Sequence, residues 1–432
     1  MRLPGFVARV PHLVAAGMLI LGSGSLAVSL ASAQEVIAIQ GARIITFDQG
    51  VIEDGTILIR GSRIEAVGAD VQVPAGAEVV DAGGLTAMPG IVDALGPARG
   101  HNISGVTGNM RAELVAGDFF DPFGADYRRE RALQDLVEWG VTSLHVRMSH
   151  SNVFDAVTSV VKLHAPESYD DHFVRYRTAV RVNLGESPRT SNAFPTTRMG
   201  ITSMVRQEFE RARDYDRRIR DAEEDGDDPP AANHRLDPLR AALNGEMPVV
   251  VRAVSPMDIE AALRLQEEFG FRLILSGSTQ AMEAHVPLLR DRDVPVILGT
   301  YYSFINSHTG ELTGFRYDAA QVLSDGGVTV AFGGLEGESK LLSLNAGIAV
   351  QNGMDPDEAL KALTLYPAQI LGVDDRIGSL EAGKDADVVL VRGDPLEITS
   401  TVERVYISGR LAHQRTPFDP SYSTIGQQEG ER

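Results

Sequence analysis

The sequence predicts an α/β protein in which a TIM-like (β/α)8 barrel is combined with a small β domain. Through the middle of the chain, continuous apolar runs alternate with helical segments, the pattern of a parallel sheet covered by helices. At both ends of the chain, short β runs are separated by turns. Neither end has enough strands to close a core alone, so we expect the two ends to pack together as one split β domain.

The first β piece is residues 34–87, where VIAIQGARIITF, GTILIRGSRIEAVG and AEVVDAGGL cluster Ile, Val and Leu around Gly and Asp. Such clusters are typical of strands that end in turns. The second piece, residues 376–415, repeats this pattern in IGSLEAGKDADVVLVRG and VERVYISGRLA. The remaining residues 416–432 are polar, and we expect a flexible tail there.

Residues 88–375 separate the two β pieces and have a size, roughly 285 residues, that suits an eightfold barrel. In this region SPMDIEAALRLQEEFG is a predicted helix with Ser255 as its N-cap and Gly270 as its stop. FRLILSG, VPVILGT and VTVAFGG are predicted strands, each next to a helical segment. A long charged helix leading into an acidic Asp-Gly-Pro loop is expected to be a solvent-facing excursion.

Composition excludes several classes of function. The 432 residues contain no cysteine, which rules out disulfides, thiolate zinc sites and cysteine nucleophiles. The formal net charge of −19 argues against nucleic acid or an anionic membrane surface as a partner.

Residues 1–33 have the features of a signal peptide. Arg2 and Arg9 precede the apolar run LVAAGMLILGSGSLAVSL, and the small residues at 31–33 fit a cleavage site. A membrane anchor is the alternative, but Gly and Ser interrupt the run and no charged stop follows it. We therefore expect an exported protein, periplasmic or secreted, with no membrane contact after cleavage.

Three stretches carry a family resemblance: VVDAGGLTAMPGIVDA, then VSPMDIEAALRLQEEFGFRLILSGSTQA with VPVILGT, and finally NAGIAVQNGMDPDEALKALTLYPAQILGVDDRIGSLEAGKDADVVLVRGDPL. Through them the sequence resembles the amidohydrolase superfamily, in its imidazolonepropionase-like and prolidase-like branch. The resemblance implies a barrel with one or two divalent metals, such as zinc, at the carboxyl ends of its strands. It also implies a small β-sandwich built from both termini. The family's usual activity is hydrolysis of non-peptide or dipeptide C–N bonds by metal-activated water.

Set against that family pattern, the positions of the metal ligands and of the proton-shuttling aspartate carry other residue types. The side chains found there hold no imidazole and no carboxylate: Leu95, Pro97, Arg252, Gly277 and Leu335. Inner-shell donors supply the binding free energy of a metal site, so we predict no metal cofactor and a chain that is a pseudoenzyme. The fourth-strand lysine of some branches aligns with either Lys162 or Arg181.

A few residues remain as candidates for restored chemistry. His101, His145 and Glu336 form one conceivable shifted metal site, although their spacing repeats no ligand pattern. Lys162 with Glu186 is a conceivable metal-free acid–base pair, and a structural ion pair is the alternative for that lysine. Arg252 is a candidate ligand for a carboxylate or phosphate, or else a residue that fills the space of the metal by pairing with an acid.

The sequence therefore leaves competing functions open. The first is a catalytically degenerate protein that binds a small molecule or regulates a ligand-complete homologue, in a homo- or hetero-oligomer. The alternative is an active C–N hydrolase with a shifted metal site or metal-free chemistry. A purely structural subunit is a third option, since fold alone does not select among functions.

Overall fold

The computed structural model describes residues 35–97, 110–122, 133–148, 151–164, 168–190, 194–277, 284–299, 304–305, 312–313, 316–334 and 339–416. Four sheets organise this part of the chain: an eight-stranded mixed sheet, a five-stranded parallel sheet, a four-stranded sheet and a two-stranded sheet of β14 (Phe304–Ile305) and β15 (Leu312–Thr313). The chain from Glu35 onward clusters into one unit. Among the described residues, no helix combines the length and the apolar character needed to cross a bilayer.

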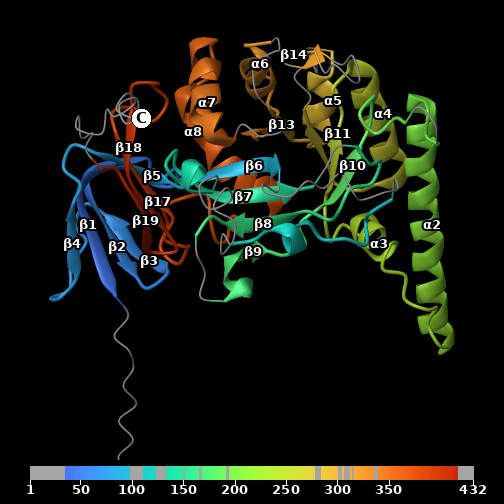
Figure 1. The fold of residues 1–432 in the computed structure, drawn as a ribbon, viewed down its shortest axis with the longest axis horizontal. Coiled ribbons are helices and arrows are strands. Elements are labelled where there is room, and N and C mark those ends of the chain that lie inside the picture. Colours follow the sequence, from blue (N-terminus) through green and yellow to red (C-terminus); the bar gives the residue numbers. More distant parts are fainter. Residues whose placement is uncertain are drawn as a thin grey trace, which may run out of the picture. The chain divides into compact units, whose positions relative to one another are not determined.

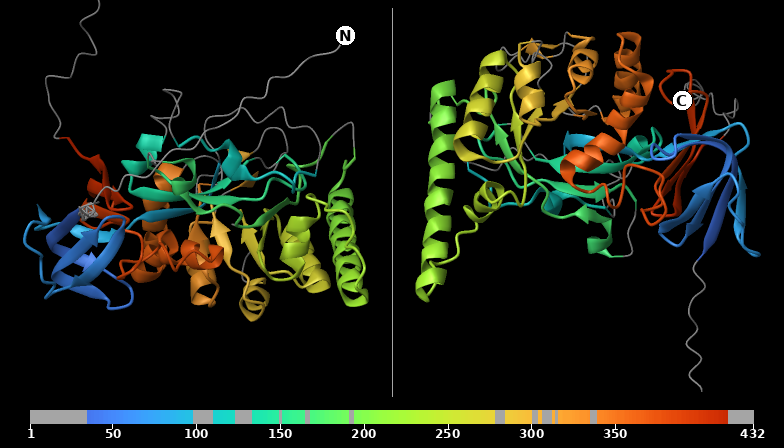
Figure 2. Two further views of the ribbon diagram at one scale, coloured as in Figure 1. Left: turned by 90° about the horizontal axis from the view of Figure 1, so that it is seen from below. Right: turned by 180° about the vertical axis from the view of Figure 1, so that it is seen from behind.

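The two ends of the chain do join in one sheet, as the sequence predicts. Its order is β19-β18-β17-β5-β1-β2-β3, with β4 also paired to β1. The blue N-terminal and red C-terminal strands lie side by side in both ribbon views (Figure 1, Figure 2). The strands are β1 (Val36–Ile45), β2 (Val51–Arg60), β3 (Arg63–Gly68), β4 (Glu78–Asp81), β5 (Thr86–Pro89), β17 (Val388–Arg392), β18 (Thr401–Ile407) and β19 (Arg410–Gln414).

Strand β5 makes the connection between the two chain ends. It runs parallel to β1 on one side and antiparallel to β17 on the other, where Met88 pairs with Val389. Alternate side chains from both ends, such as Ile39, Ile57 and Leu390, pack in a shared apolar cluster. Because hydrogen bonds link all eight strands in one sheet, the finer description as a two-sheet sandwich is not confirmed.

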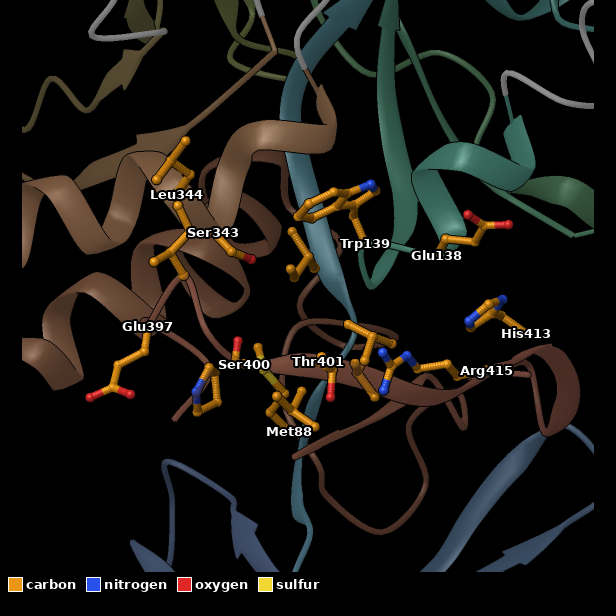
Figure 3. Close-up of a pocket in the computed structure, with 16 residues that line it drawn as sticks. Met88, Glu138, Trp139, Ser343, Leu344, Glu397, Ser400, Thr401, His413 and Arg415 are labelled. Carbon is orange, nitrogen blue, oxygen red and sulfur yellow. The ribbon is translucent and has the colours of Figure 1, made fainter. Parts of the chain in front are cut away.

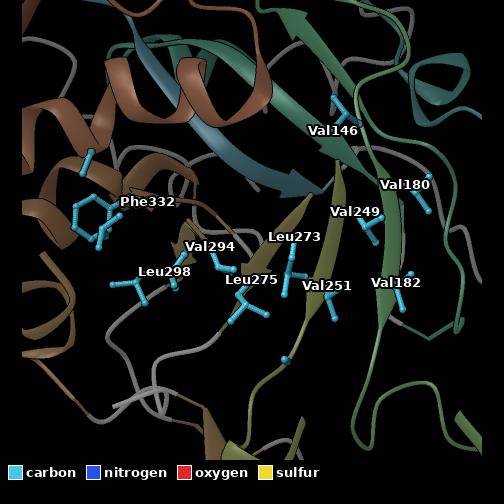
Figure 4. Packing of buried hydrophobic residues seen from close by; sticks show 14 of the residues in the cluster. Val146, Val180, Val182, Val249, Val251, Leu273, Leu275, Val294, Leu298 and Phe332 are labelled. Atoms are coloured by element: carbon cyan, nitrogen blue, oxygen red, sulfur yellow. The ribbon is translucent and has the colours of Figure 1, made fainter. Parts of the chain in front are cut away.

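The five-stranded sheet is parallel throughout, as the apolar runs predict. Its order is β10 (Val180–Asn183), β11 (Val249–Arg252), β12 (Leu273–Ser276), β13 (Val296–Leu298) and β16 (Val330–Phe332). One set of alternate side chains, including Val180, Val249 and Leu273, belongs to the large core that contacts the helices (Figure 4). The opposite set forms a smaller cluster: Ala179, Val250, Ile274, Ile297 and Ala331, together with Ala94 and Leu95.

The second cluster defines an interior toward which six segments point, and this gives the fold its barrel-like character. Strand β6 (Ile91–Pro97) approaches β16 closely, since a Cβ on Gly333 would lie 3.0 Å from the Leu95 backbone nitrogen. Near the same place, the Gly334 backbone N–H donates to Asp93 at 2.9 Å. No ladder joins β6 to β16 within the described residues, so hydrogen bonding does not close a complete ring there.

The four-stranded sheet corrects the prediction of an all-parallel barrel. Strand β6 is parallel to β7 (Val141–Arg147), but β8 (Ser159–Lys162) runs antiparallel to β7, and β9 (Phe173–Arg175) antiparallel to β8. Parallel neighbours need a crossover of about a dozen residues or more, usually a helix. Only residues 148–158 separate β7 from β8, so the chain folds back instead.

Helices follow most strands of the parallel sheet. They are α2 (Arg198–Asp225), α3 (Asp237–Leu243), α4 (Pro256–Phe269), α5 (Val286–Asp291), α6 (Ala319–Asp325), α7 (Leu342–Gln351), α8 (Pro356–Leu363) and α9 (Leu365–Leu371). Helix α4 begins after Ser255, whose side chain accepts from the Asp258 backbone nitrogen, and ends at Gly270 in a left-handed conformation. Both predicted ends of this helix are confirmed.

Helix α2 departs from the expected solvent-facing excursion. Its first half buries one apolar face, including Ile201, Val205 and Phe209. The Phe209 ring lies 5.3 Å from that of Phe269 and 5.0 Å from that of Phe271. The helix packs against α3 and α4 (Figure 2). The charged residues therefore line only the outer side of a helix whose other side belongs to the core.

Candidate functional site

The carboxyl ends of β6, β7, β10, β11 and β12 form the candidate site, because loops at this edge of a parallel sheet carry the chemistry of such folds. Residues on neighbouring strands are level with one another there. The ladders pair Asn183 with Arg252, and Arg252 with Ser276. All three side chains point to the same face of the sheet as Val250 and Ile274, which lie two residues before Arg252 and Ser276.

On β6 the first two expected ligand positions have structural roles. Leu95 is fully buried in the interior apolar cluster, and its backbone N–H donates to Asp93 Oδ1 at 3.0 Å. Pro97 ends the strand and pairs with Arg147 of β7. Neither side chain has a donor atom for a metal ion.

On β11 and β12 the next two positions are equally unsuited to a cation. Arg252 is 6% exposed. Gly277, directly after β12, has φ 74°, a conformation that favours glycine. The fifth position, Leu335, lies outside the described residues, as do the candidates His101 and Glu336.

On or beside these strands, the described residues include three buried guanidinium groups and two buried carboxylates. Arg147, Arg181 and Arg252 come from β7, β10 and β11, and Arg181 Nε lies 3.9 Å from Asp155 Oδ2. Asp93 is the second acid. Sequence reasoning missed Arg147, Asp93 and Asp155. The alternation of side chains along β7 could have indicated Arg147 as a site residue, because Arg147 lies on the same face as His145, two positions earlier.

Asp93 binds the backbone on both sides of the β6–β16 approach. Its Oδ1 accepts from the Leu95 N–H at 3.0 Å and from the Gly334 N–H at 2.9 Å. Burial raises the pKa of this carboxyl, and the hydrogen bonds and the nearby Arg147 cation act against that rise. Through these hydrogen bonds, Asp93 holds β6 beside the end of β16.

His145 is fully buried in β7, and both of its ring nitrogens are hydrogen-bonded within the protein. Nδ1 lies 2.6 Å from the Ala94 carbonyl oxygen, and Nε2 lies 2.7 Å from Thr158 Oγ1. Because a carbonyl only accepts, Nδ1 carries the proton, and Nε2 is hydrogen-bonded to the Thr158 hydroxyl. Burial lowers the pKa of His145 to about 4. This corrects its assignment to a shifted metal site, since no ring nitrogen is left for a metal.

Lys162 does not pair with Glu186, which corrects the proposed acid–base pair. The ammonium group is 1% exposed and forms ion pairs with Asp387 and, at 3.1 Å, with Asp385. These aspartates precede β17, in the sheet formed by the chain ends. Glu186 instead binds Arg189 and Arg198, each at 2.8 Å. Lys162 therefore links β8 to the terminal sheet, the structural alternative that the sequence left open.

A divalent metal does not fit the described residues at these strand ends. Within the ranges that the structure describes, no three His, Cys, Asp or Glu side chains come together as a metal-binding group. The positions that would hold the ion present an aliphatic side chain, a proline ring, a guanidinium and a glycine. A guanidinium is permanently charged and repels a cation.

Cavities lined by described residues also lie away from the strand ends. One, of about 310 Å³, is lined by Ile91 and Trp139, which stand at the starts of β6 and β7, and by Val389 of β17 (Figure 3). Another, of about 530 Å³, is lined by His164 and by all of β19. Because both lie beside the terminal sheet, neither belongs to the candidate site.

Known proteins that resemble this chain include several amidohydrolases. The profile of the amidohydrolase family matches residues 278–412. The amidohydrolase tasK of Hapsidospora irregularis is 26% identical over 381 residues, which is 78% of this chain and 37% of that protein. An imidazolonepropionase from Thermoplasma volcanium is 35% identical over 113 residues, 23% of this chain and 27% of that enzyme. The alignments thus span well under half the length of these two relatives.

A solved structure extends the likeness to the fold. The crystal structure of an amidohydrolase from Thermotoga maritima is 27% identical, with a TM-score of 0.80, and the match covers 88% of this chain and all of that one. The sequence likeness and the shared fold together confirm the predicted relationship. Residues 278–412 thus match the amidohydrolase family, and the described part of the chain has the fold of a solved amidohydrolase.

Proposed function

We propose that this chain is a catalytically degenerate amidohydrolase that binds a small anionic molecule at the carboxyl ends of its strands. The observation that supports the proposal is the arginine cluster Arg147, Arg181 and Arg252, buried on three strands at the place where the family pattern requires metal ligands. A guanidinium matches carboxylate or phosphate oxygens in a bidentate geometry and has no lone pair for a metal.

The surroundings of Arg252 favour an anion over a cation. Asn183 and Ser276, its ladder neighbours, are neutral hydrogen-bonding residues that add no negative charge. The nearby acids are Asp93 and Asp155, and burial raises the pKa of Asp93. Among these five described groups, three are guanidinium cations and two are carboxylic acids. A carboxylate or phosphate bound there would gain charge-assisted hydrogen bonds in a site shielded from water.

Thermal unfolding in the presence of simple anions tests the proposal. Inorganic phosphate and succinate should raise the Tm of the wild-type chain above that in sodium chloride of equal ionic strength, because a ligand of the folded state stabilises it. Arg252→Leu should lose most of this difference, and Arg189→Leu, at an arginine that is half-exposed, is the matched control. If the Arg252→Leu variant melts higher and responds to anions as the wild type does, Arg252 only fills space.

The active hydrolase remains the alternative, with a site that includes His101 and Glu336. Elemental analysis of the purified chain separates the two functions. Stoichiometric zinc, manganese or iron would contradict the degenerate reading, and so would steady hydrolysis of an N-acyl amino acid that chelators abolish.

Two further parts of the proposal concern the place and partners of the chain. We propose export after cleavage near residue 33, which N-terminal sequencing of the protein from the periplasm or medium would test. We also propose that the chain pairs with a ligand-complete homologue. Co-purification of such a homologue with the tagged full-length chain would support this, and isolation of the chain alone at native expression levels would oppose it.

A further inference from the structure

A cavity of about 310 Å³ lies at the amino ends of β6 and β7, and we call it the Trp139 cavity. Ile91 is the first residue of β6, and Trp139 stands two residues before β7. Strand β6 is roughly 20 Å long, so this cavity and the candidate site at the carboxyl ends of the strands are separate places. Ligand pockets have volumes of about 300 to 1,000 Å³. The Trp139 cavity therefore suits a small molecule.

The floor of the Trp139 cavity is apolar and belongs to the large core. A Cβ added to Gly140 would lie 3.2 Å from Val389 Cγ1, so the strands are closely packed beneath it. Burial in the core fixes the side chains of the floor, which is therefore formed before a ligand arrives. Each of these side chains is at most 3% exposed: Met88 of β5, Ile91 of β6, and Val389 and Val391 of β17.

Two large apolar side chains line the cavity and also reach the solvent. Trp139 is 51% exposed, and Ile398 is 82% exposed. Exposed apolar surface costs free energy, and beside a cavity it marks a place where an apolar group binds. The indole ring, which Figure 3 shows across the cavity from Met88, provides a wide flat surface for such a group.

The charged side chains at the rim favour a negative group at one end of the cavity. Figure 3 shows the Arg415 guanidinium and the His413 ring directed toward the middle of the cavity. The carboxylates of Glu138 and Glu397, which also belong to the lining, are directed away from the middle. Both glutamates are exposed, so water screens their charge. A ligand carboxylate beside Arg415 therefore meets a cation inside the cavity.

Arg415 shares its carboxylate partner with a second arginine. Arg415 Nη1 lies 3.6 Å from Glu403 Oε1, and Arg392 Nε lies 2.9 Å from the same oxygen. Of these three described groups, two are cations and one is an anion, and the shorter contact belongs to Arg392. The Arg415 side chain is 49% exposed. Its guanidinium is thus accessible to a ligand carboxylate, which it can bind in a bidentate geometry.

We infer that the Trp139 cavity is a second binding site, and that its ligand is a small amphipathic acid: an apolar chain or ring that carries one carboxylate. The apolar part lies between the indole ring and the floor at Met88 and Val389. The carboxylate pairs with Arg415 and accepts a hydrogen bond from the His413 ring. This site goes beyond the proposed function, because it uses none of the arginines at the strand ends. We assign it binding alone, since the chemistry of such folds belongs to the carboxyl ends of the strands.

Fluorescence titration tests the inference at the site itself, because Trp139 is the one tryptophan of the sequence. Hexanoate should shift the emission to the blue and saturate, with a Kd on the order of a millimolar, as its chain excludes water from the indole. At equal ionic strength, hexanamide, which has the same chain without the charge, should bind about fivefold or more weakly. Hexylamine, which is positively charged, should bind more weakly still. An unsaturable response to hexanoate, or tighter binding of hexylamine, would overturn the inference.

A pair of matched variants tests the position of the carboxylate. Arg415→Gln should weaken hexanoate binding about fivefold or more and leave hexanamide binding nearly unchanged, because only the anion uses the guanidinium. Arg410→Gln removes the same charge from an exposed position on β19 outside the lining of this cavity, and it should bind hexanoate as the wild type does. Substitutions at such exposed positions alter stability little. Equal losses in both variants would reveal a general effect of net charge and contradict the assignment to Arg415.

Calorimetry on Trp139→Ala provides a measurement that does not use fluorescence. The variant should bind hexanoate about fivefold more weakly, because the apolar chain loses its contact with the indole ring. Unchanged affinity would place the ligand elsewhere. So would loss of the wild-type fluorescence response in Arg252→Leu, since the carboxylate would then act from the strand ends. A blue shift that appears without ligand as the protein concentration rises would show that a second copy fills the cavity, which also contradicts the inference.

Discussion

Two groups of charged residues in the described part of the chain, the junction cluster and the strand-end cluster, differ in where they lie in the fold. The junction cluster consists of Lys162, Arg376 and Arg63 with Asp385 and Asp387, where the barrel-like part meets the terminal sheet. The strand-end cluster consists of Arg147, Arg181 and Arg252 with Asp93 and Asp155.

The contacts at the junction bring each cation within ion-pair distance of a carboxylate. Asp385 forms three ion pairs, with Lys162 at 3.1 Å, Arg376 at 2.9 Å and Arg63 at 2.8 Å. At the strand ends, Arg181 Nε lies 3.9 Å from Asp155 Oδ2. Tight matching is typical of a structural role. A cationic group at the carboxyl ends of parallel strands is instead typical of a binding site. Lys162, at the junction, therefore has a structural role, and Arg252, at the strand ends, is the candidate for ligand binding.

The largest expected effect follows from breaking the junction cluster. Lys162→Met should lower the free energy of unfolding by about 3–5 kcal/mol, because it leaves two buried carboxylates without their ammonium partner. Urea denaturation of the full chain measures the loss. A change below about 1 kcal/mol would remove the contrast between the two clusters. The double variant Lys162→Met with Asp387→Leu should recover part of the stability, since it removes one of the orphaned charges.

A somewhat smaller effect is expected from acid, through His145. Its folded-state pKa of about 4 lies below the value near 6.5 for an unfolded chain, so the unfolded state binds the proton more readily. Its contribution to stability is therefore complete above about pH 6.5 and declines as the pH falls toward 4, by about 3 kcal/mol in total.

Unfolding free energies of the wild type and of His145→Gln between pH 7 and pH 4 check the expectation. The variant should be less stable at pH 7 but show a shallower decline with acid. If the two slopes were the same, the buried histidine would not be the group that titrates. Asp385 contributes in the same direction at lower pH. Burial tends to raise the pKa of Asp385, but Lys162 and Arg376 outweigh it and lower the pKa, so its stabilisation is lost as the pH falls through that depressed value.

The smallest effect is expected at the rim of the junction cluster. The Arg63 side chain is 48% exposed although it lies 2.8 Å from Asp385. Arg63→Ala should cost less than about 1 kcal/mol, because water screens an exposed ion pair. The same denaturation assay measures it beside Lys162→Met. A loss comparable with that of Lys162→Met would mean that the exposed and buried cations of the cluster are equivalent.

Features carried by local sequence were predictable. Ser255 and Gly270 mark the ends of α4 through capping chemistry that involves only neighbouring residues. The apolar runs at 249–252 and 273–276 are parallel strands buried on both faces, as their composition indicates. The reversal of β8 was also within reach, since the segment 148–158 is too short for a helical crossover, and the sequence interpretation did not weigh that length.

The partners of the candidate residues were not predictable in the same way. Lys162 and Asp387 are 225 positions apart in the chain, and no local pattern relates them. His145 reads in the sequence as a possible ligand, yet its ring nitrogens are taken by Ala94 and by Thr158. Arg147 shares a face of β7 with His145, but its charged neighbour Asp93 comes from β6, and local sequence does not relate the two.

By itself, the amino-acid sequence determined which residue types stand at the expected metal positions, because Leu95, Pro97 and Gly277 lack donor atoms in any conformation. It also carried the resemblance to the amidohydrolases, the parallel strands and the joining of the two chain ends. Only the tertiary structure decided that Lys162 serves the junction and that Arg147, Arg181 and Arg252 are all buried. The physical reason is that burial and pairing of charge depend on contacts between distant segments, whereas donor chemistry belongs to each side chain alone.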